Sequence, residues 1–223
     1  MSQYQCVIFD WDGTLMDSKA RIVHAIQVAA ERAGFEVLPA RTCQQIIGLS
    51  LHNAVRTLYP EADAQAIEQM SQGYTQCFLN ESEVPMKPFS GLDTLMQSVR
   101  SQGAKTVIAT GKSRRGLDQV LDETQLAHYF DWTRTPMESA SKPDPLMLTQ
   151  VLEKYDLAPE QALMVGDTTF DMQMAHALGM DRVAMAHGVH ALEDLLTYDP
   201  VAHCHDLSQL QAWLSDKVLA HTG

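Results

Sequence analysis

The sequence predicts an α/β protein with a doubly wound parallel sheet and an inserted block of helices. From about residue 91 onward, short apolar runs alternate with stretches of helical periodicity, a pattern typical of parallel sheets covered by helices on both faces. Residues 16–83 instead show helical patterns and no good strand. We therefore expect an α/β core formed by residues 1–15 and 84–223 and an inserted α-helical unit formed by residues 16–83.

The first expected elements are a strand and the helices of the insert. Residues 4–9 form a short apolar run, which is typical of a buried strand. Over residues 18–33, Ile, Val and Ala recur at helical spacing, and Gly34 suits a helix C-terminus. Further helices of the insert are expected near residues 40–47, 51–58 and 63–80. A segment rich in Pro and Gly, residues 85–91, is expected to return the chain to the core.

The rest of the core is expected to alternate between helices and strands. The expected strands are residues 104–109, a weak one near 129–133, 162–166 and 182–186. The expected helices are residues 91–102, 113–122, 145–155, 170–178 and about 207–218. This alternation favours a parallel sheet, because parallel strands need a crossover connection that a helix usually provides.

The composition disfavours nucleic acid and membrane as partners, and it does not exclude a small anionic substrate. The net charge of −12, from 28 acidic residues against 16 Lys and Arg, disfavours binding to a phosphate backbone. No apolar run approaches the ~18 residues needed to cross a bilayer, and no signal-peptide pattern is visible. The four Cys contain no C-x-x-C pair, so free thiols in a cytoplasmic protein are expected. Both a monomer and a homodimer remain open.

Two carboxylates stand two residues apart directly after the first expected strand. Asp10 and Asp12 are followed by Gly13 and Thr14, which predict a sharp turn. Buried acids are costly unless a counter-charge compensates them. Paired carboxylates suit a hard divalent cation such as Mg²⁺. The sequence therefore predicts a Mg²⁺ site at this turn.

Other polar residues follow the ends of later strands. The next expected strands end at Thr110-Gly111 and at Asp167, and a polar turn, Ser141-Lys142-Pro143, precedes a helix between them. In open parallel sheets, ligands bind beyond the carboxyl ends of the strands. We expect these residues to gather with Asp10 at one edge of the sheet.

In order and residue type, these four places resemble the motifs of the haloacid dehalogenase superfamily, whose first motif is Asp-x-Asp-Gly-Thr. The resemblance implies a Rossmann-like core and a Mg²⁺-dependent hydrolase of a small phosphorylated metabolite. It makes Asp10 the nucleophile that forms an aspartyl phosphate, and Asp12 the acid and base. It implies that Thr110, Gly111 and Lys142 bind the phosphoryl group. It also implies that the metal is bound by Asp10, Asp167 and the backbone carbonyl of Asp12, and that Asp171 supports the metal site.

The helical insert resembles the cap of subfamily I, which closes over the core site. Gly48-Leu49-Ser50 breaks the cap helices and is expected to reach toward that site. His52, Asn53 and Arg56 follow on one helix and could meet a substrate anion. Phosphoglycolate phosphatases look closest, through Asp-Gly-Thr-Leu-x-Asp-Ser and a later Thr-x-Lys, but they often carry Asn where this chain has Gly111.

Several alternatives remain. A β-phosphoglucomutase keeps both acids and the cap, but typically has Gly-Val where this chain has Gly13-Thr14. A phosphate-binding regulator without turnover would be expected to lose Asp10, Asp12 or Asp167. A P-loop at Gly111-Lys112-Ser113 is rejected because position 106 is Thr and not Gly. Zinc at His203-Cys204-His205 is not expected, because neighbouring residues of an extended chain point to opposite faces. The substrate stays open among 2-phosphoglycolate, a sugar phosphate, a nucleotide and pyrophosphate.

Overall fold

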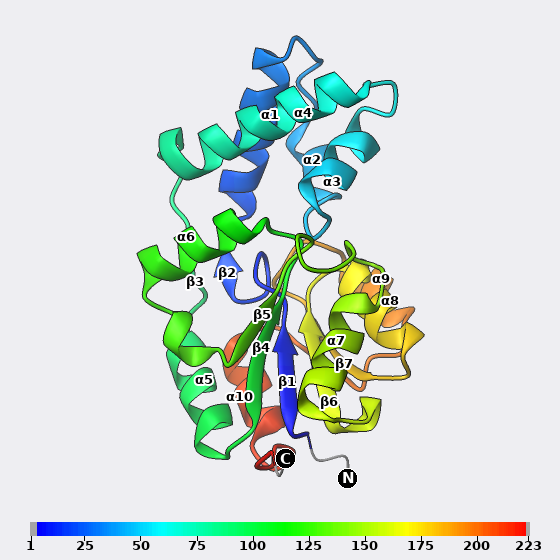
Figure 1. Ribbon diagram of the computed structural model, residues 1–223. Coiled ribbons are helices and arrows are strands. Elements are labelled where there is room, and N and C mark those ends of the chain that lie inside the picture. The colour runs from blue at the N-terminus through cyan, green and yellow to red at the C-terminus, as the bar shows by residue number, and fades with distance from the viewer. Residues whose placement is uncertain (1–3, 222–223) are drawn as a thin grey trace.

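A computed structural model describes residues 4–221 and shows a six-stranded parallel sheet with helices on both faces (Figure 1). The strand order is β5-β4-β1-β6-β7-β8, and every neighbouring pair is parallel. The chain thus extends the sheet from β1 in one direction and then in the other, as a doubly wound fold does. The strands are β1 (Cys6–Phe9), β4 (Lys105–Ala109), β5 (Trp132–Arg134), β6 (Ala162–Gly166), β7 (Asp181–Met185) and β8 (Ala202–Cys204).

The central strands are apolar because both of their faces are covered. In β1, Val7 and Phe9 pack into one apolar cluster, whereas Cys6 and Ile8 pack into another on the opposite face. The first cluster contains side chains of α5 (Leu92–Ser101), α6 (Arg114–Thr124) and α10 (Leu207–Leu214). The second contains side chains of α7 (Leu146–Tyr155) and α8 (Thr169–Ala177). The remaining core helices are α9 (Leu192–Leu196) and the short 3₁₀ turns η2 (Ala127–Tyr129) and η3 (Pro159–Gln161).

The block between the first two core strands is helical and stands beyond the carboxyl end of β1 (Figure 1). Its longest helices, α1 (Lys19–Arg32) and α4 (Ala64–Gln76), approach closely because Gly73 faces Ala29. A Cβ added at Gly73 would lie 3.5 Å from the Ala29 Cα. Asp63 caps α4, since its Oδ1 accepts a hydrogen bond from the Ala66 N–H. The helices are α1 (Lys19–Arg32), α2 (Ala40–Gln44), α3 (Leu51–Leu58), α4 (Ala64–Gln76) and the π-helical turn η1 (Cys77–Glu81).

The chain leaves and re-enters the core at one place. The two-residue strands β2 (Met16–Asp17) and β3 (Lys87–Pro88) pair antiparallel, and they lie at the two ends of the helical block. The prediction of no strand in this block is therefore wrong at β2. Two residues are too few to show an alternating pattern in the sequence.

Most expected elements are present, with shifted ends. Gly34 has a φ of 76° just after α1, as a C-terminal stop requires. The weak strand expected near 129–133 begins later, because η2 occupies residues 127–129. The last helix ends at Leu214 and not near 218, since Val218 forms a bridge with Tyr4. Helix α9 and edge strand β8 were not predicted. None of the helices within residues 4–221 has the length and apolar character needed to span a bilayer.

Candidate active site

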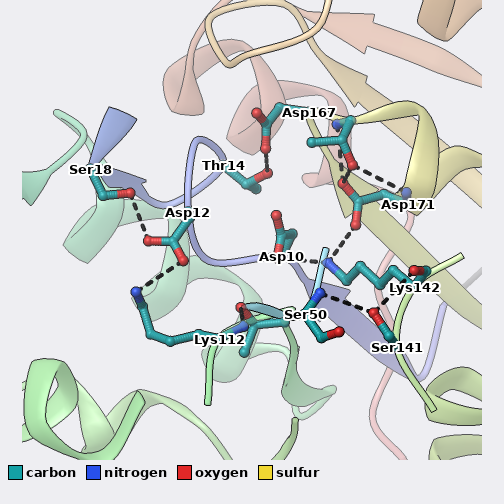
Figure 2. A network of polar contacts seen from close by, with 12 residues as sticks. Asp10, Asp12, Thr14, Ser18, Ser50, Lys112, Ser141, Lys142, Asp167 and Asp171 are labelled. Atoms are coloured by element: carbon teal, nitrogen blue, oxygen red, sulfur yellow. Dashed lines mark hydrogen bonds and ion pairs between the residues drawn. The ribbon is translucent and has the colours of Figure 1, made fainter. Parts of the chain in front are cut away.

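Polar residues that follow β1, β4 and β6, among them Asp10, Lys112 and Asp167, lie at one edge of the sheet (Figure 2). These three strands are parallel neighbours, so their carboxyl ends meet there. Asp10 follows β1, Thr110 follows β4 and Asp167 follows β6, and all three are buried. The expected gathering of these side chains is thus observed.

Lys142 links two of the buried acids. Its Nζ donates to Asp10 Oδ1 over 2.7 Å and to Asp171 Oδ1 over 2.5 Å. Burial alone lowers the pKa of Lys142, but the two carboxylates outweigh it and raise that pKa. Lys142 therefore stays charged and provides the cation that these buried acids need.

Three carboxylates share this single cation. Asp10, Asp167 and Asp171 offer oxygens that lie within 4.8 Å of one another, and this is the grouping of possible metal ligands found within the described residues. Burial raises the pKa of Asp10 well above its usual range, and the charges of Asp171 and Asp167 add to the rise in spite of Lys142. Burial and repulsion by Asp171 raise the pKa of Asp167 to about 7. The cluster is short of positive charge.

A hard divalent cation fits this deficit. Asp10 Oδ2 is buried and accepts no hydrogen bond from any residue that the structure describes. An unpartnered carboxylate oxygen among acids is the kind of ligand that Mg²⁺ prefers. The buried cluster of Asp10, Asp167 and Asp171 could therefore bind a divalent cation, and Asp10 offers it an unused oxygen.

Both oxygens of Asp171, unlike Oδ2 of Asp10, accept hydrogen bonds from neighbouring groups. Thr168 donates to Asp171 Oδ2 through its backbone N–H, over 3.1 Å, and through its hydroxyl, over 2.7 Å. The other oxygen, Oδ1, accepts from Lys142. Asp171 thus orients Lys142, and it also forms a reciprocal capping box with Thr168 at the start of α8.

Asp167 is held by the first-motif turn and a later loop. Thr14 Oγ1 donates to Asp167 Oδ1 over 2.6 Å, and the Val189 N–H donates to Oδ2 over 2.8 Å. Gly13, at φ 87°, leaves room for this carboxylate, because a Cβ there would lie 2.3 Å from Asp167 Oδ2. Glycine is therefore required at position 13 for both conformation and space.

The Asp12 carboxylate is oriented separately from the acidic cluster (Figure 2). Ser18 Oγ donates to Asp12 Oδ1 over 2.7 Å, and Lys112 Nζ lies 3.1 Å from Asp12 Oδ2. The Asp12 side chain is not part of the acidic grouping with Asp10 and Asp167. Metal binding by Asp12 through its backbone carbonyl stays a prediction.

The loop Gly48-Leu49-Ser50 contacts the core beside this site. A Cβ on Gly111 would lie 2.2 Å from the Gly48 carbonyl oxygen and 2.6 Å from that of Leu49. The Ser50 N–H donates to Ser141 Oγ over 3.0 Å, next to Lys142. The cap loop therefore packs directly against the backbone of Gly111, where a larger residue would not fit.

The other cap residues considered for substrate binding lie elsewhere. His52, Asn53 and Arg56 are exposed, and none of the three lines the cavity beside Asp10 and Asp12. His52 instead lies 3.5 Å from Glu68 on the cap surface. These side chains do not face the acids of the core.

The residues missed by sequence reasoning are those that orient the acids. Lys112, Ser18, Thr14 and Ser141 each contact a candidate site residue or the cap loop. The Thr-x-Lys and Asp-Ser patterns were the available signals for Lys112 and Ser18. Ser113 is the N-cap of α6, as expected, since its hydroxyl accepts from the Gly116 N–H.

Comparison with known proteins agrees with this geometry. Residues 7–185 match the family model described as haloacid dehalogenase-like hydrolase. The phosphoglycolate phosphatase of Nitrosospira multiformis is 25% identical over 201 residues, covering 87% of this chain and 88% of that protein. The pyrophosphatase PpaX of Bacillus anthracis is 26% identical over 211 residues, covering 94% of this chain and 96% of that protein.

A solved structure has the same fold. The haloacid dehalogenase-like hydrolase SP0104 from Streptococcus pneumoniae superposes with a TM-score of 0.83 and is 26% identical, covering 96% of this chain and 99% of its own. The family match spans most of the chain and includes all four motif positions. The chain therefore belongs to the haloacid dehalogenase-like hydrolase family.

Proposed function

We propose that this phosphatase hydrolyses small phosphate monoesters with Mg²⁺, through an aspartyl phosphate formed on Asp10. The observation that carries the proposal is the position of Asp10. One of its oxygens is held by Lys142, the other is buried without a hydrogen-bond partner among the described residues, and the residue lines a cavity under the cap. Phosphatase relatives such as the phosphoglycolate phosphatase of Nitrosospira multiformis support this activity.

The proposed reaction has two steps. A carboxylate oxygen of Asp10 attacks phosphorus, the bond to the leaving oxygen breaks, and Asp12 gives that oxygen its proton. A water then attacks phosphorus, Asp12 takes a proton from it, and the bond between Asp10 and phosphorus breaks. Thr110 and the backbone near Gly111, which line the same cavity, would bind phosphoryl oxygens, and Lys142 would steady Asp10 through its hydrogen bond.

We propose that Asp10, Asp167 and the backbone carbonyl of Asp12 hold the Mg²⁺, with Asp171 supporting the site through Lys142. The bound ion would neutralise charge on the phosphoryl group. We also propose a core of residues 1–15 and 84–223 and a cap of residues 16–83, which the pairing of β2 with β3 supports. A cytoplasmic location is proposed from four buried free cysteines.

The test is phosphate release from a panel of phosphorylated metabolites, measured with Mg²⁺ and with EDTA. We expect release that requires Mg²⁺ and that returns when Mg²⁺ is added after EDTA. Release that EDTA leaves unchanged would contradict the metal requirement. If no compound is hydrolysed, phosphorylation of β-glucose 1-phosphate with a bisphosphate activator tests the mutase alternative.

Mg²⁺ binding is expected to strengthen as the pH rises. A cation must displace the proton of Asp167, whose pKa is about 7, so affinity should rise about tenfold between about pH 6 and pH 8. Because this pKa lies above the ordinary 3.8, the metal-free fold loses stability as the pH rises toward 7. Calorimetric titration at both pH values measures the affinity. Equal affinities would contradict the assignment of Asp167 as a ligand.

Gly111→Ala is expected to reduce turnover by displacing the cap. The new Cβ would overlap the Gly48 and Leu49 carbonyl oxygens, so the loop must move by about 1 Å, a displacement that can lower kcat/KM by about 100-fold. Steady-state kinetics on the best substrate measures the effect. Gly34→Ala is the control, because a Cβ there meets nothing within 4 Å. Its φ of 76° makes that change cost stability, but kcat/KM should stay unchanged because Gly34 does not line the cavity. Unchanged kcat/KM in Gly111→Ala would show that the contact is not needed.

A further inference from the structure

We infer that the leaving group of the natural substrate is uncharged and apolar, and that an aryl phosphate suits this site better than an ester bearing a carboxylate or second phosphate. The inference rests on the proposed phosphatase function and concerns the cavity next to Asp10 and Asp12. The cap side of that cavity is mainly hydrocarbon. Its wall includes Ile22, Ile26, Ile46, Ile47, Phe78 and Leu79.

This apolar wall comes from separate cap segments. Ile22 and Ile26 lie one turn apart on α1, whereas Ile46 and Ile47 precede the loop that rests on Gly111. Phe78 lies in η1 and is 3% exposed. Three segments thus turn aliphatic or aromatic side chains toward the proposed nucleophile, and burial of an apolar group against them is favourable.

Positive charge is missing from the cap side of the cavity. The cap contains five Lys and Arg residues and two His, and none of them is among the residues that line this cavity within the described chain. Arg21 donates to the Val84 carbonyl over 2.7 Å, and Arg32 pairs with Glu81 at 2.7 Å. A carboxylate on the leaving group would therefore meet no cap cation.

Lys112 is the cation that does line the cavity, and its charge is already balanced. Its Nζ lies 3.1 Å from Asp12 Oδ2 and 4.2 Å from the centroid of the Phe78 ring, and its side chain is 6% exposed. A substrate carboxylate would compete with Asp12 for this ammonium group. The site would then hold two anions against one cation, which is unfavourable where both are shielded from water.

An aromatic pair favours a flat leaving group. Tyr74 and Phe78 stack with ring centroids 5.6 Å apart and an interplanar angle of 18°, and both line the cavity. Burial and the negative charge of Asp12 raise the pKa of Tyr74, so its hydroxyl stays protonated. A ring placed beside this pair gains stacking, and the phenol can donate to an uncharged oxygen.

Contacts between cap and core border this cavity. The Gly48 and Leu49 carbonyls lie against Gly111, and Ser50 is hydrogen-bonded to Ser141. A neighbouring groove carries Arg115 and His52, and it shares Leu51, Thr75, Gly111 and Ser113 with the cavity. Charged groups thus line the groove, whereas no charged side chain among the described residues lines the cap wall of the cavity beside Asp10.

The test compares two aryl phosphates of similar size, 4-methylphenyl phosphate and 4-carboxyphenyl phosphate, with Mg²⁺ at neutral pH. We expect kcat/KM to favour the methyl compound by about 100-fold, the cost of burying an uncompensated charge. The carboxylate makes the phenol a better leaving group, so intrinsic reactivity opposes this result. 2-Phosphoglycolate and pyrophosphate should be poorer than both phenyl phosphate and the methyl compound.

A charge introduced into the wall should change the preference. Leu79→Arg places a guanidinium at the partly buried edge of the cavity. We expect it to raise kcat/KM for 4-carboxyphenyl phosphate, relative to that for 4-methylphenyl phosphate, at least tenfold. Ile46→Arg is the second variant, in case the first does not fold. Leu196→Arg, at a position 42% exposed on α9, is the control and should keep the wild-type ratio.

The two proposals fail differently. Mg²⁺-dependent release that favours the carboxylate compound, 2-phosphoglycolate or pyrophosphate would contradict the inference of an apolar leaving group. The proposed phosphatase function would still hold. An absence of release from every compound, with folded protein and Mg²⁺ present, would overturn the phosphatase itself. Equal kcat/KM for the two aryl phosphates would also overturn the inference, because the wall would then not discriminate charge.

Discussion

The Asp10→Asn variant is expected to lose Mg²⁺-dependent phosphate release by ~10⁴-fold or more, because an amide cannot form the acyl phosphate. The fold should persist. Asn still offers an oxygen to Lys142, and it removes one negative charge from a cluster in which burial already raises the pKa of Asp10. Steady-state phosphate release and thermal unfolding measure the two effects.

Asp17→Asn is the matched control for this variant. Asp17 is an exposed acid of β2, a few residues along the same segment, and the same substitution there should leave turnover unchanged. Trapping of labelled phosphate on the protein after acid quenching should succeed with the wild type and fail with Asp10→Asn. Turnover near the wild-type rate in purified Asp10→Asn would exclude Asp10 as the nucleophile.

Replacement of Lys142 by Met should reduce both stability and activity. Loss of the cation leaves the buried carboxylates of Asp10 and Asp171 unpaired, which is expected to cost about 3–5 kcal/mol of unfolding free energy. The two acids raise the pKa of Lys142, so its stabilising charge is present throughout neutral pH. Turnover should fall by about 10³-fold, since Asp10 also loses its orienting donor.

The pH dependence of this loss distinguishes charge from packing. At about pH 5 the raised pKa values of Asp10 and Asp167 allow both acids to take up protons, so the destabilisation should be smaller than at about pH 8. Denaturant unfolding at both pH values measures it. Lys87→Met, at an exposed position of β3, is the control and should change little. An equal loss at both pH values would point to packing instead of charge.

Much of the site could be predicted because it follows from backbone topology. Asp10, Thr110 and Asp167 each follow a strand of a parallel sheet, so their meeting at one edge requires only the order of the strands. Lys142 was assigned by resemblance, and its long side chain then reaches Asp10 and Asp171 from another loop. The short elements β2, β8 and α9 were missed or misjudged, because so few residues carry no measurable period.

The sequence by itself determined the alternating core, the helical insert and the identity of the acids, since each depends on local pattern or on short motifs. The tertiary structure decided which groups orient those acids and what faces them across the cavity. The pairing of Lys112 with Asp12, the seating of the Gly48 carbonyl on Gly111 and the wall formed by Phe78 all join residues far apart in the chain. Such contacts depend on how the helical insert packs against the α/β core, and the local periodicity of the sequence does not predict that packing.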